Sequence, residues 1–140
     1  MTRVALIGLG GIAQSVHLPV IQRNRAEVDL AAVVELSPSR LTTFGERYGV
    51  PQEGRFTSLD ALLGAIAEGS VVIDAAIVAT GGGHTDEALA LIRAGVKVLV
   101  EKPLGRSSAD LEALVAGLAE DGLDPRAWLR IGYMKEYDPA

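Results

Sequence analysis

The sequence predicts an α/β fold in which a doubly wound, mostly parallel sheet of six strands carries helices on both faces. A short apolar segment, residues 3–7, runs straight into a glycine-rich turn at residues 8–13. Further apolar segments alternate with helical patterns along the chain, as right-handed βαβ crossovers require. The length of 140 residues fits one domain that is large enough to bury its own core.

The turn at residues 8–13 matches the pattern G-x-G-x-x-A. Gly8 lets the chain turn sharply out of the strand, and Gly10 has no Cβ, so that a pyrophosphate can lie against the backbone. Ala13 keeps the following helix close to the sheet, and the helix that starts near Gly11 and Ile12 points its free N–H groups at the phosphates. This turn predicts a Rossmann-type dinucleotide site formed by these five residues.

Other segments of the first half fit the same fold. Residues 12–23 have helical spacing, and Pro19 should bend this helix or end its regular hydrogen bonding because it lacks an N–H. Residues 28–34 form a nearly continuous apolar run, which is typical of a strand that is buried on both faces. Ser37 and Pro38 predict the N-cap and first position of a helix that continues to about residue 48.

The second half repeats the alternation of strands and helices. The expected elements are a short strand at 55–57, a helix capped by Ser58, a strand at 71–79, a helix at 84–94, a strand at 97–100, a helix at 111–119 with a capping box from Ser107 and Asp110, and a strand at 128–133.

Composition and charge restrict the function classes. The net charge of −5 and the absence of a basic stripe argue against a nucleic-acid partner. No apolar run is long enough to span a membrane, and a strand that begins by residue 3 leaves no room for a signal peptide. The chain has no cysteine, which excludes disulfides and thiolate metal sites and is compatible with the cytoplasm, where we expect the protein.

The cofactor prediction depends on Glu35, which ends the 28–34 strand close to the offset of about 20 residues expected for the acid that binds the adenosine ribose. A 2′-phosphate beside this carboxylate would cost about 3 kcal/mol per unit-charge pair at about 5 Å and an effective dielectric near 20. Glu35 therefore favours NAD. Arg40 lies one helical turn on and could reach a phosphate, so NADP stays possible.

Two further strand ends carry candidate residues. Thr80 to His84 follow the 71–79 strand through three glycines, and His84 either lies beside the cofactor or merely opens the next helix. Lys102 follows the 97–100 strand and precedes a proline. Its ammonium could hydrogen-bond a substrate hydroxyl or polarise a carbonyl as negative charge develops.

The chain resembles the glucose–fructose oxidoreductase / inositol dehydrogenase (Gfo/Idh/MocA) family of NAD(P)-dependent sugar and polyol oxidoreductases. The segment from Ala94 to Leu104, AGVKVLVEKPL, is the most specific of the matching motifs. The other matching stretches are Gly8–Ala13 with His17-Leu18-Pro19, Val78-Ala79-Thr80 with His84, and Gly132–Lys135 with Asp138-Pro139.

The resemblance implies that Lys102 is a catalytic residue beside the nicotinamide and that Glu101 and Thr80 help to shape the cofactor pocket. Family members usually have a proline after the position of Thr80 and one more residue before that of His84, and often an arginine at that of Glu136. They also continue into an α/β substrate domain that supplies the catalytic Asp/His pair. Residues 1–140 are therefore expected to be the dinucleotide-binding domain of a longer, two-domain enzyme.

Several functions fit this expectation. The first is the cofactor-binding half of a sugar or polyol dehydrogenase, which binds NAD and has no activity by itself. The second is a stand-alone nucleotide-binding module that forms homo-oligomers through an apolar patch of Trp128, Ile131, Tyr133 and Met134. A third is binding of S-adenosylmethionine or another nucleotide, because the fold alone does not determine the ligand.

Overall fold

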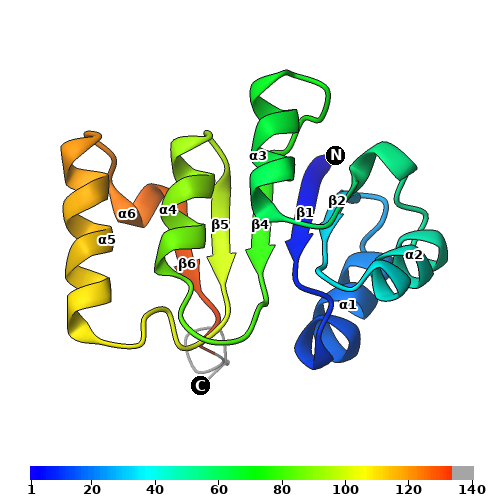
Figure 1. The fold of residues 1–140 in the computed structure, drawn as a ribbon, viewed down its shortest axis with the longest axis horizontal. Coiled ribbons are helices and arrows are strands. Elements are labelled where there is room, and N and C mark those ends of the chain that lie inside the picture. Colours follow the sequence, from blue (N-terminus) through cyan, green and yellow to red (C-terminus); the bar gives the residue numbers. More distant parts are fainter. Residues whose placement is uncertain (134–140) are drawn as a thin grey trace.

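The computed structural model describes residues 1–133 and contains one six-stranded, entirely parallel sheet (Figure 1). The strand order is β3-β2-β1-β4-β5-β6, the order of a doubly wound dinucleotide-binding sheet. The fold prediction is therefore confirmed. The strands are β1 (Thr2–Ile7), β2 (Val28–Val34), β3 (Arg55–Phe56), β4 (Ala75–Val78), β5 (Lys97–Val100) and β6 (Leu129–Ile131).

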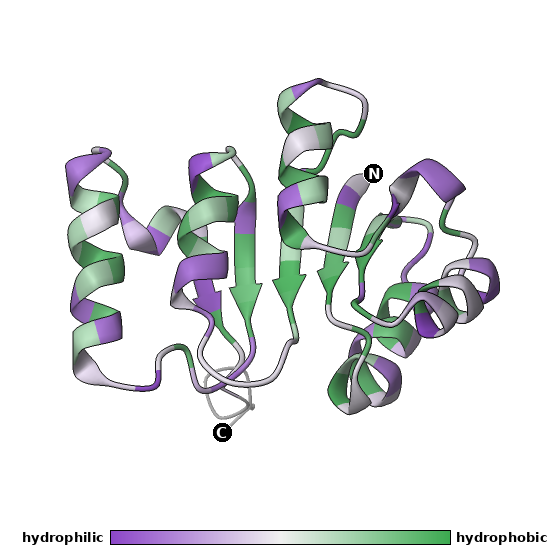
Figure 2. Cartoon of the chain, viewed as in Figure 1, coloured by the Kyte–Doolittle hydropathy of each residue, from purple (hydrophilic) through white to green (hydrophobic). Residues whose placement is uncertain are grey.

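Helices cover both faces of the sheet. The cluster on one face joins strand residues such as Ile7, Val78 and Val100 to α3 (Leu59–Ala67), α4 (Thr85–Arg93) and α5 (Ser108–Glu120). The cluster on the other face packs β1 and β2 against α1 (Leu18–Arg23) and α2 (Pro38–Arg47). The strands are the most continuously hydrophobic segments, as Figure 2 shows. Shorter helical turns are η1 (Ala13–His17), η2 (Gln52–Gly54) and α6 (Pro125–Trp128).

The predicted helix caps are present. The hydroxyls of Ser37 and Ser58 accept hydrogen bonds from backbone N–H groups in the first turns of α2 and α3. Ser107 and Asp110 form the reciprocal capping box at the start of α5, with aspartate in place of the commoner glutamate or glutamine. Short polar side chains therefore determine where each of these helices begins.

The prediction of a strand over residues 71–79 is wrong at its start, because β4 begins only at Ala75. Asp74 forms an ion pair with Arg3, with 2.7 Å between Arg3 Nη2 and Asp74 Oδ1, and it also accepts a hydrogen bond from the Arg3 backbone N–H. Its carboxylate therefore lies at the amino-terminal end of β1. The apolar residues Val71 and Ile73 pack into the core from a loop.

The predicted strand over 128–133 is also shorter than expected. Asp124 caps the helical turn α6, which contains Trp128, and β6 occupies only Leu129–Ile131. Pro125 is favourable at the first position of a helical turn, a signal that the apolar pattern obscured. The predicted motif residues Met134, Lys135, Asp138 and Pro139, and the divergent Glu136, lie outside the described residues.

The first helix is interrupted as Pro19 predicts, by a π-helix. This segment, η1, covers Ala13–His17, and the α-helix α1 then begins at Leu18 with Pro19 in its first turn. A short π-helix inside an α-helix inserts an extra residue and often lies at a functional site. Here it ends at His17, whose ring faces the end of β5.

The half of the second face that β4, β5 and β6 form has no helix over it within residues 1–133 (Figure 1). Ile77 and Leu99 are only partly buried there, and they line a cavity of about 820 Å³ together with Trp128 and Arg130. The sheet is therefore covered unequally. None of the helices in the described part of the chain is long and apolar enough to cross a membrane.

Candidate cofactor site

The glycine turn leaves β1 in the conformation that its sequence predicts. Gly8 has a φ of +90°, and a Cβ at this position would lie 3.0 Å from the carbonyl oxygen of Ala79. A larger residue would therefore be strained and would clash with the end of β4. A Cβ on Gly10 or Gly11 would meet no protein atom within 4 Å, so this side of the turn is open, and Ala13 packs fully buried behind it.

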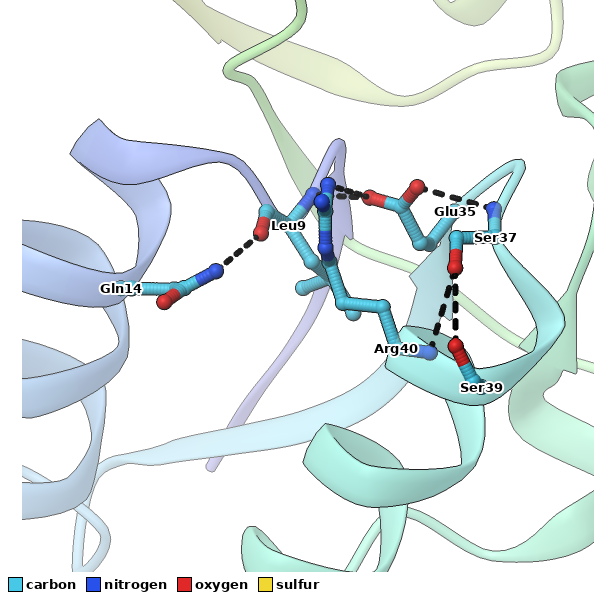
Figure 3. Close-up of polar contacts among 6 residues, drawn as sticks. All are labelled: Leu9, Gln14, Glu35, Ser37, Ser39 and Arg40. Atoms are coloured by element: carbon cyan, nitrogen blue, oxygen red, sulfur yellow. Dashed lines mark hydrogen bonds and ion pairs between the residues drawn. The ribbon is translucent and has the colours of Figure 1, made fainter.

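Glu35 joins this turn to the end of β2 (Figure 3). Its Oε2 accepts a hydrogen bond of 3.0 Å from the Leu9 N–H, and its Oε1 accepts one of 3.0 Å from the Ser37 N–H. Arg40 Nη1 lies 3.4 Å from Oε2. The turn is also held from its other side, because the Gln14 amide donates to the Leu9 carbonyl. Glu35 thus stabilises the glycine turn and is also a candidate ligand of the ribose.

Glu35 is buried, and its side chain is only 10% exposed. Burial alone would raise its pKa, but the backbone hydrogen bonds from Ser37 and Leu9 and the charge of Arg40 outweigh burial, so the pKa lies below its ordinary value. Glu35 is therefore ionised at neutral pH. A carboxylate has about four acceptor positions, so acceptor capacity is left for the hydroxyls of a ribose.

A cavity of about 500 Å³ opens between the ends of β1, β2 and β4. Ligands bind at this edge of such sheets, at the switch point of the strand order. Of the predicted site residues, five line it: Gly8, Gly10, Glu35, Arg40 and Thr80. Gly11, Ile12, Ala13, His84, Glu101 and Lys102 are not in its lining.

His84 supports the cavity from behind. The residue is the N-cap of α4, but its side chain makes no capping bond and is 1% exposed. Its Nδ1 lies 3.1 Å from Thr80 Oγ1 and 3.2 Å from Glu87 Oε2, and the Thr80 hydroxyl donates to the same Glu87 oxygen at 2.9 Å. Glu87 lines the cavity and was not predicted, although an acid one turn after His84 was a visible signal.

Glu101 faces the other side of the sheet edge. Its Oε1 lies 2.7 Å from His17 Nε2, and both residues line the 820 Å³ cavity below the uncovered face. The sequence predicted Glu101 and gave His17 only as part of a family motif. The contact between the two could not be read from their spacing, because 84 residues separate them.

Lys102 directly follows Glu101 beyond β5, and its side chain is exposed. The peptide bond that joins it to Pro103 is cis. The ammonium group has no ion pair with any residue from 1 to 133. It lies at the carboxyl edge of the sheet, on the strand next to the one that carries Thr80.

These residues fit a dinucleotide. The open side of Gly10 and Gly11 can accept a pyrophosphate, and the ionised Glu35 can accept bonds from ribose hydroxyls. Residues 1–133 contain no group of three or more His, Asp or Glu side chains that could hold a metal ion. Glu101, Lys102 and Thr80 bring a carboxylate, an ammonium group and a hydroxyl to the carboxyl edge of the sheet.

Comparisons with known proteins agree with this geometry. Residues 2–124 match the model of the Gfo/Idh/MocA family, described as an oxidoreductase family with an NAD-binding Rossmann fold. The chain is 30% identical over 122 residues to a putative UDP-kanosamine synthase oxidoreductase subunit of Amycolatopsis mediterranei, covering 86% of this chain and 31% of the relative. It is 33% identical over 135 residues to an inositol 2-dehydrogenase of Leifsonia xyli, covering 94% of this chain and 37% of that enzyme.

Solved structures show the same relationship. The aldose-aldose oxidoreductase of Caulobacter crescentus superposes with a TM-score of 0.79 at 30% identity, covering 98% of this chain and 39% of that one. A 3-ketoreductase of Actinomadura kijaniata, solved with TDP-benzene and NADP, gives a TM-score of 0.75 at 30% identity over 99% of this chain and 40% of its own.

The chain thus spans between 31% and 40% of the length of these relatives. The glycine turn, Glu35 and the E-K-P segment all lie within the part that they share with it. The chain belongs to the Gfo/Idh/MocA oxidoreductase family and forms its NAD-binding Rossmann domain.

Proposed function

We propose that residues 1–140 are the cofactor-binding domain of a longer oxidoreductase that transfers hydride between a nicotinamide cofactor and a sugar or polyol hydroxyl. The observation that carries the proposal is the buried, ionised carboxylate of Glu35, hydrogen-bonded to the N–H of Leu9 inside the glycine turn. In this proposal the carboxylate accepts hydrogen bonds from the ribose, next to the turn that holds the pyrophosphate. Relatives that are named for action on inositol and aldoses support the substrate class.

In this proposal Gly8, Gly10 and Gly11 hold the pyrophosphate, with Ile12 and Ala13 at the start of the following helix. Glu35 accepts hydrogen bonds from the adenosine ribose and disfavours a 2′-phosphate by charge repulsion. Arg40 offsets part of that repulsion because its guanidinium lies beside the Glu35 carboxylate. We therefore propose NAD as the preferred cofactor and NADP as a weaker one.

Lys102 and Glu101 act at the nicotinamide end in this proposal. Bound nicotinamide would supply the hydride chemistry. Lys102, exposed beyond β5, would hydrogen-bond the reacting hydroxyl and help to hold or move its proton. Thr80 would shape the pocket from β4, with His84 and Glu87 fixing its hydroxyl. The base that completes proton removal would come from outside these 140 residues.

We expect this chain to bind NAD and to turn nothing over. Isothermal titration calorimetry with NAD up to millimolar concentration tests the first part. If the folded chain shows no detectable binding, the cofactor proposal is wrong. Absorbance of NADH at saturating NAD, with a panel of polyols and aldoses, tests the second part. Polyol-dependent NADH formation by the purified chain would show that it needs no further domain.

A second candidate function is self-association through the uncovered face of the sheet. The cavity there is lined by apolar side chains, including Ile77, Leu99 and Trp128, and contiguous apolar surface drives association. Sedimentation velocity from micromolar to near-millimolar concentration measures it. A species that stays monomeric over this range rules it out, and a dimer weakened by Leu99→Gln supports it.

A further inference from the structure

Arg106 lies across the glycine turn that follows β4. A Cβ built on Gly82 would be 2.6 Å from Arg106 Nη2, and one built on Gly83 would be 2.9 Å from Arg106 Cγ. Gly82 also has a φ of +98°. The turn therefore has no side chains where the arginine lies, and the stem and the guanidinium rest directly on backbone.

The backbone of Arg106 is fixed in place. The Asp110 carboxylate accepts hydrogen bonds from the N–H groups of Arg106 at 2.8 Å and Ser107 at 3.1 Å. The preceding segment is tied to the glycine turn, because the His84 N–H donates to the Leu104 carbonyl at 2.8 Å. Two anchors thus hold the backbone of Arg106 beside the turn.

Arg106 is part of the wall of the cofactor cavity. It lines the same 500 Å³ space as Gly8, Gly10 and Arg40. Arg40 is beside Glu35, whereas the Arg106 side chain has no ion pair with any residue in the range 1–133. The charge of Arg106 is thus available to a ligand in this cavity. Guanidinium groups pair best with carboxylates and phosphates.

We propose that Arg106 binds a phosphate group of the dinucleotide, and that Gly82 and Gly83 serve to seat this arginine. The inference rests on the proposed cofactor function. Two phosphates could supply the ligand: the pyrophosphate, present in NAD and NADP alike, or the adenosine 2′-phosphate of NADP. In either case Arg106 contributes to cofactor affinity.

The test is calorimetric titration of the 140-residue chain and Arg106→Ala with NAD, NADP and adenosine. We expect Arg106→Ala to weaken dinucleotide binding about tenfold, as loss of one charge-assisted contact does, and to leave adenosine binding unchanged. Arg126→Ala is the matched control, because Arg126 is an exposed arginine outside this cavity. An equal loss for NAD and NADP assigns the pyrophosphate, and a larger loss for NADP assigns the 2′-phosphate.

A second variant tests whether the missing side chain of Gly83 makes room for Arg106. The φ of Gly83 is not positive, so alanine is compatible with its backbone, but the new Cβ would lie 2.9 Å from Arg106 Cγ and 3.2 Å from the Arg106 backbone nitrogen. We expect Gly83→Ala to weaken NAD binding several-fold in the wild type and by less when Arg106 is already alanine, because only the contact with the backbone then remains. Fully additive losses would overturn the seating role.

The outcomes separate the two proposals. NAD binding of equal strength in the wild type, Arg106→Ala and Arg126→Ala overturns this inference and leaves the cofactor function intact. A matching loss of adenosine affinity in Arg106→Ala also overturns it, since adenosine has no phosphate. A wild-type chain that binds no NAD overturns the cofactor function, and this inference with it.

Discussion

His17 Nε2 lies 2.7 Å from Glu101 Oε1, and this contact joins the first helix to the carboxyl end of β5. The two side chains are only 12% and 19% exposed. His17 is the last residue of the π-helix, so the extra residue in that turn helps to set where its ring lies. Since Lys102 is the next residue after Glu101, the contact holds the start of the segment that carries Lys102.

We expect His17→Ala to lower the free energy of unfolding by about 1–2 kcal/mol, because it leaves the Glu101 carboxylate largely buried without its partner. Urea denaturation of the wild type, His17→Ala, Glu101→Ala and the double variant measures the coupling energy between the two side chains. Glu101→Gln is the matched control, since the amide oxygen can still accept a hydrogen bond. Additive effects of the two alanine changes would show that the contact contributes nothing.

Glu35→Ala should weaken NAD binding about tenfold or more, because it removes a ribose acceptor and leaves the Leu9 and Ser37 N–H groups without their partner. NADP binding should fall less, since a repelling charge is lost as well. Titration of both cofactors measures the change in preference. Glu46→Ala, an exposed acid on α2, should alter neither; an unchanged NAD preference in Glu35→Ala would contradict the assignment.

Gly8→Ala and Gly10→Ala should separate folding from binding. The first places a side chain at a φ of +90° and 3.0 Å from the Ala79 carbonyl oxygen, which should destabilise the fold by about 1–3 kcal/mol. The second meets open space, so the stability should stay near that of the wild type while NAD binding weakens. Thermal unfolding with and without NAD measures both, and equal destabilisation by the two changes would contradict the predicted roles.

The Arg3–Asp74 pair should make stability depend on pH in the acid range. Hydrogen bonds from the side chain and backbone of Arg3 lower the pKa of Asp74 to about 2. A carboxyl group whose pKa is depressed on folding stabilises the fold above its unfolded pKa and loses that contribution as the pH falls through the folded value.

Asp74→Asn should therefore lower the unfolding midpoint at pH 7, and the difference from the wild type should shrink between about pH 4 and pH 2. Chemical denaturation at pH 7, 4 and 2.5 measures it. Asp60→Asn is the control, because Asp60 lies in the first turn of α3 and forms no ion pair with Arg3. A difference that persists unchanged at the lowest pH would contradict the role of the ion pair.

Most of the fold could be predicted because local signals determine it. Ser37, Ser58 and Ser107 mark helix starts, and the bounds of β2 and β5 agree with their apolar runs. One error arose where a long-range partner is involved: Asp74 pairs with Arg3, 71 residues away in sequence, and β4 begins only after it. The other arose from a local signal that was overlooked, because Asp124 and Pro125 begin a helical turn where a strand was expected.

The site residues that follow strand ends could be predicted, whereas those contributed by α4 and by the loop before α5 could not. Gly8, Gly10, Glu35 and Thr80 meet in one cavity because parallel strands bring their carboxyl ends to the same edge, and Arg40 joins them from the first turn of α2. Glu87 and Arg106 enter that cavity from other elements, and their place depends on how α4 and the loop before α5 pack. His84 resembles a ligand in sequence, but burial makes it a support for Thr80 and Glu87.

The uneven cover of the sheet has a consequence for how the domain opens. The strands β1 and β2 are packed on both faces, whereas β6 has three residues, one neighbour and a face that no helix of residues 1–133 covers. Backbone amides exchange with solvent at the free energy of the smallest opening that frees them. In this half of the sheet, hydrogen exchange should therefore begin at β6 and proceed inward toward β1, so that the strand end beside Glu101 is less protected than the strand that leads into the glycine turn.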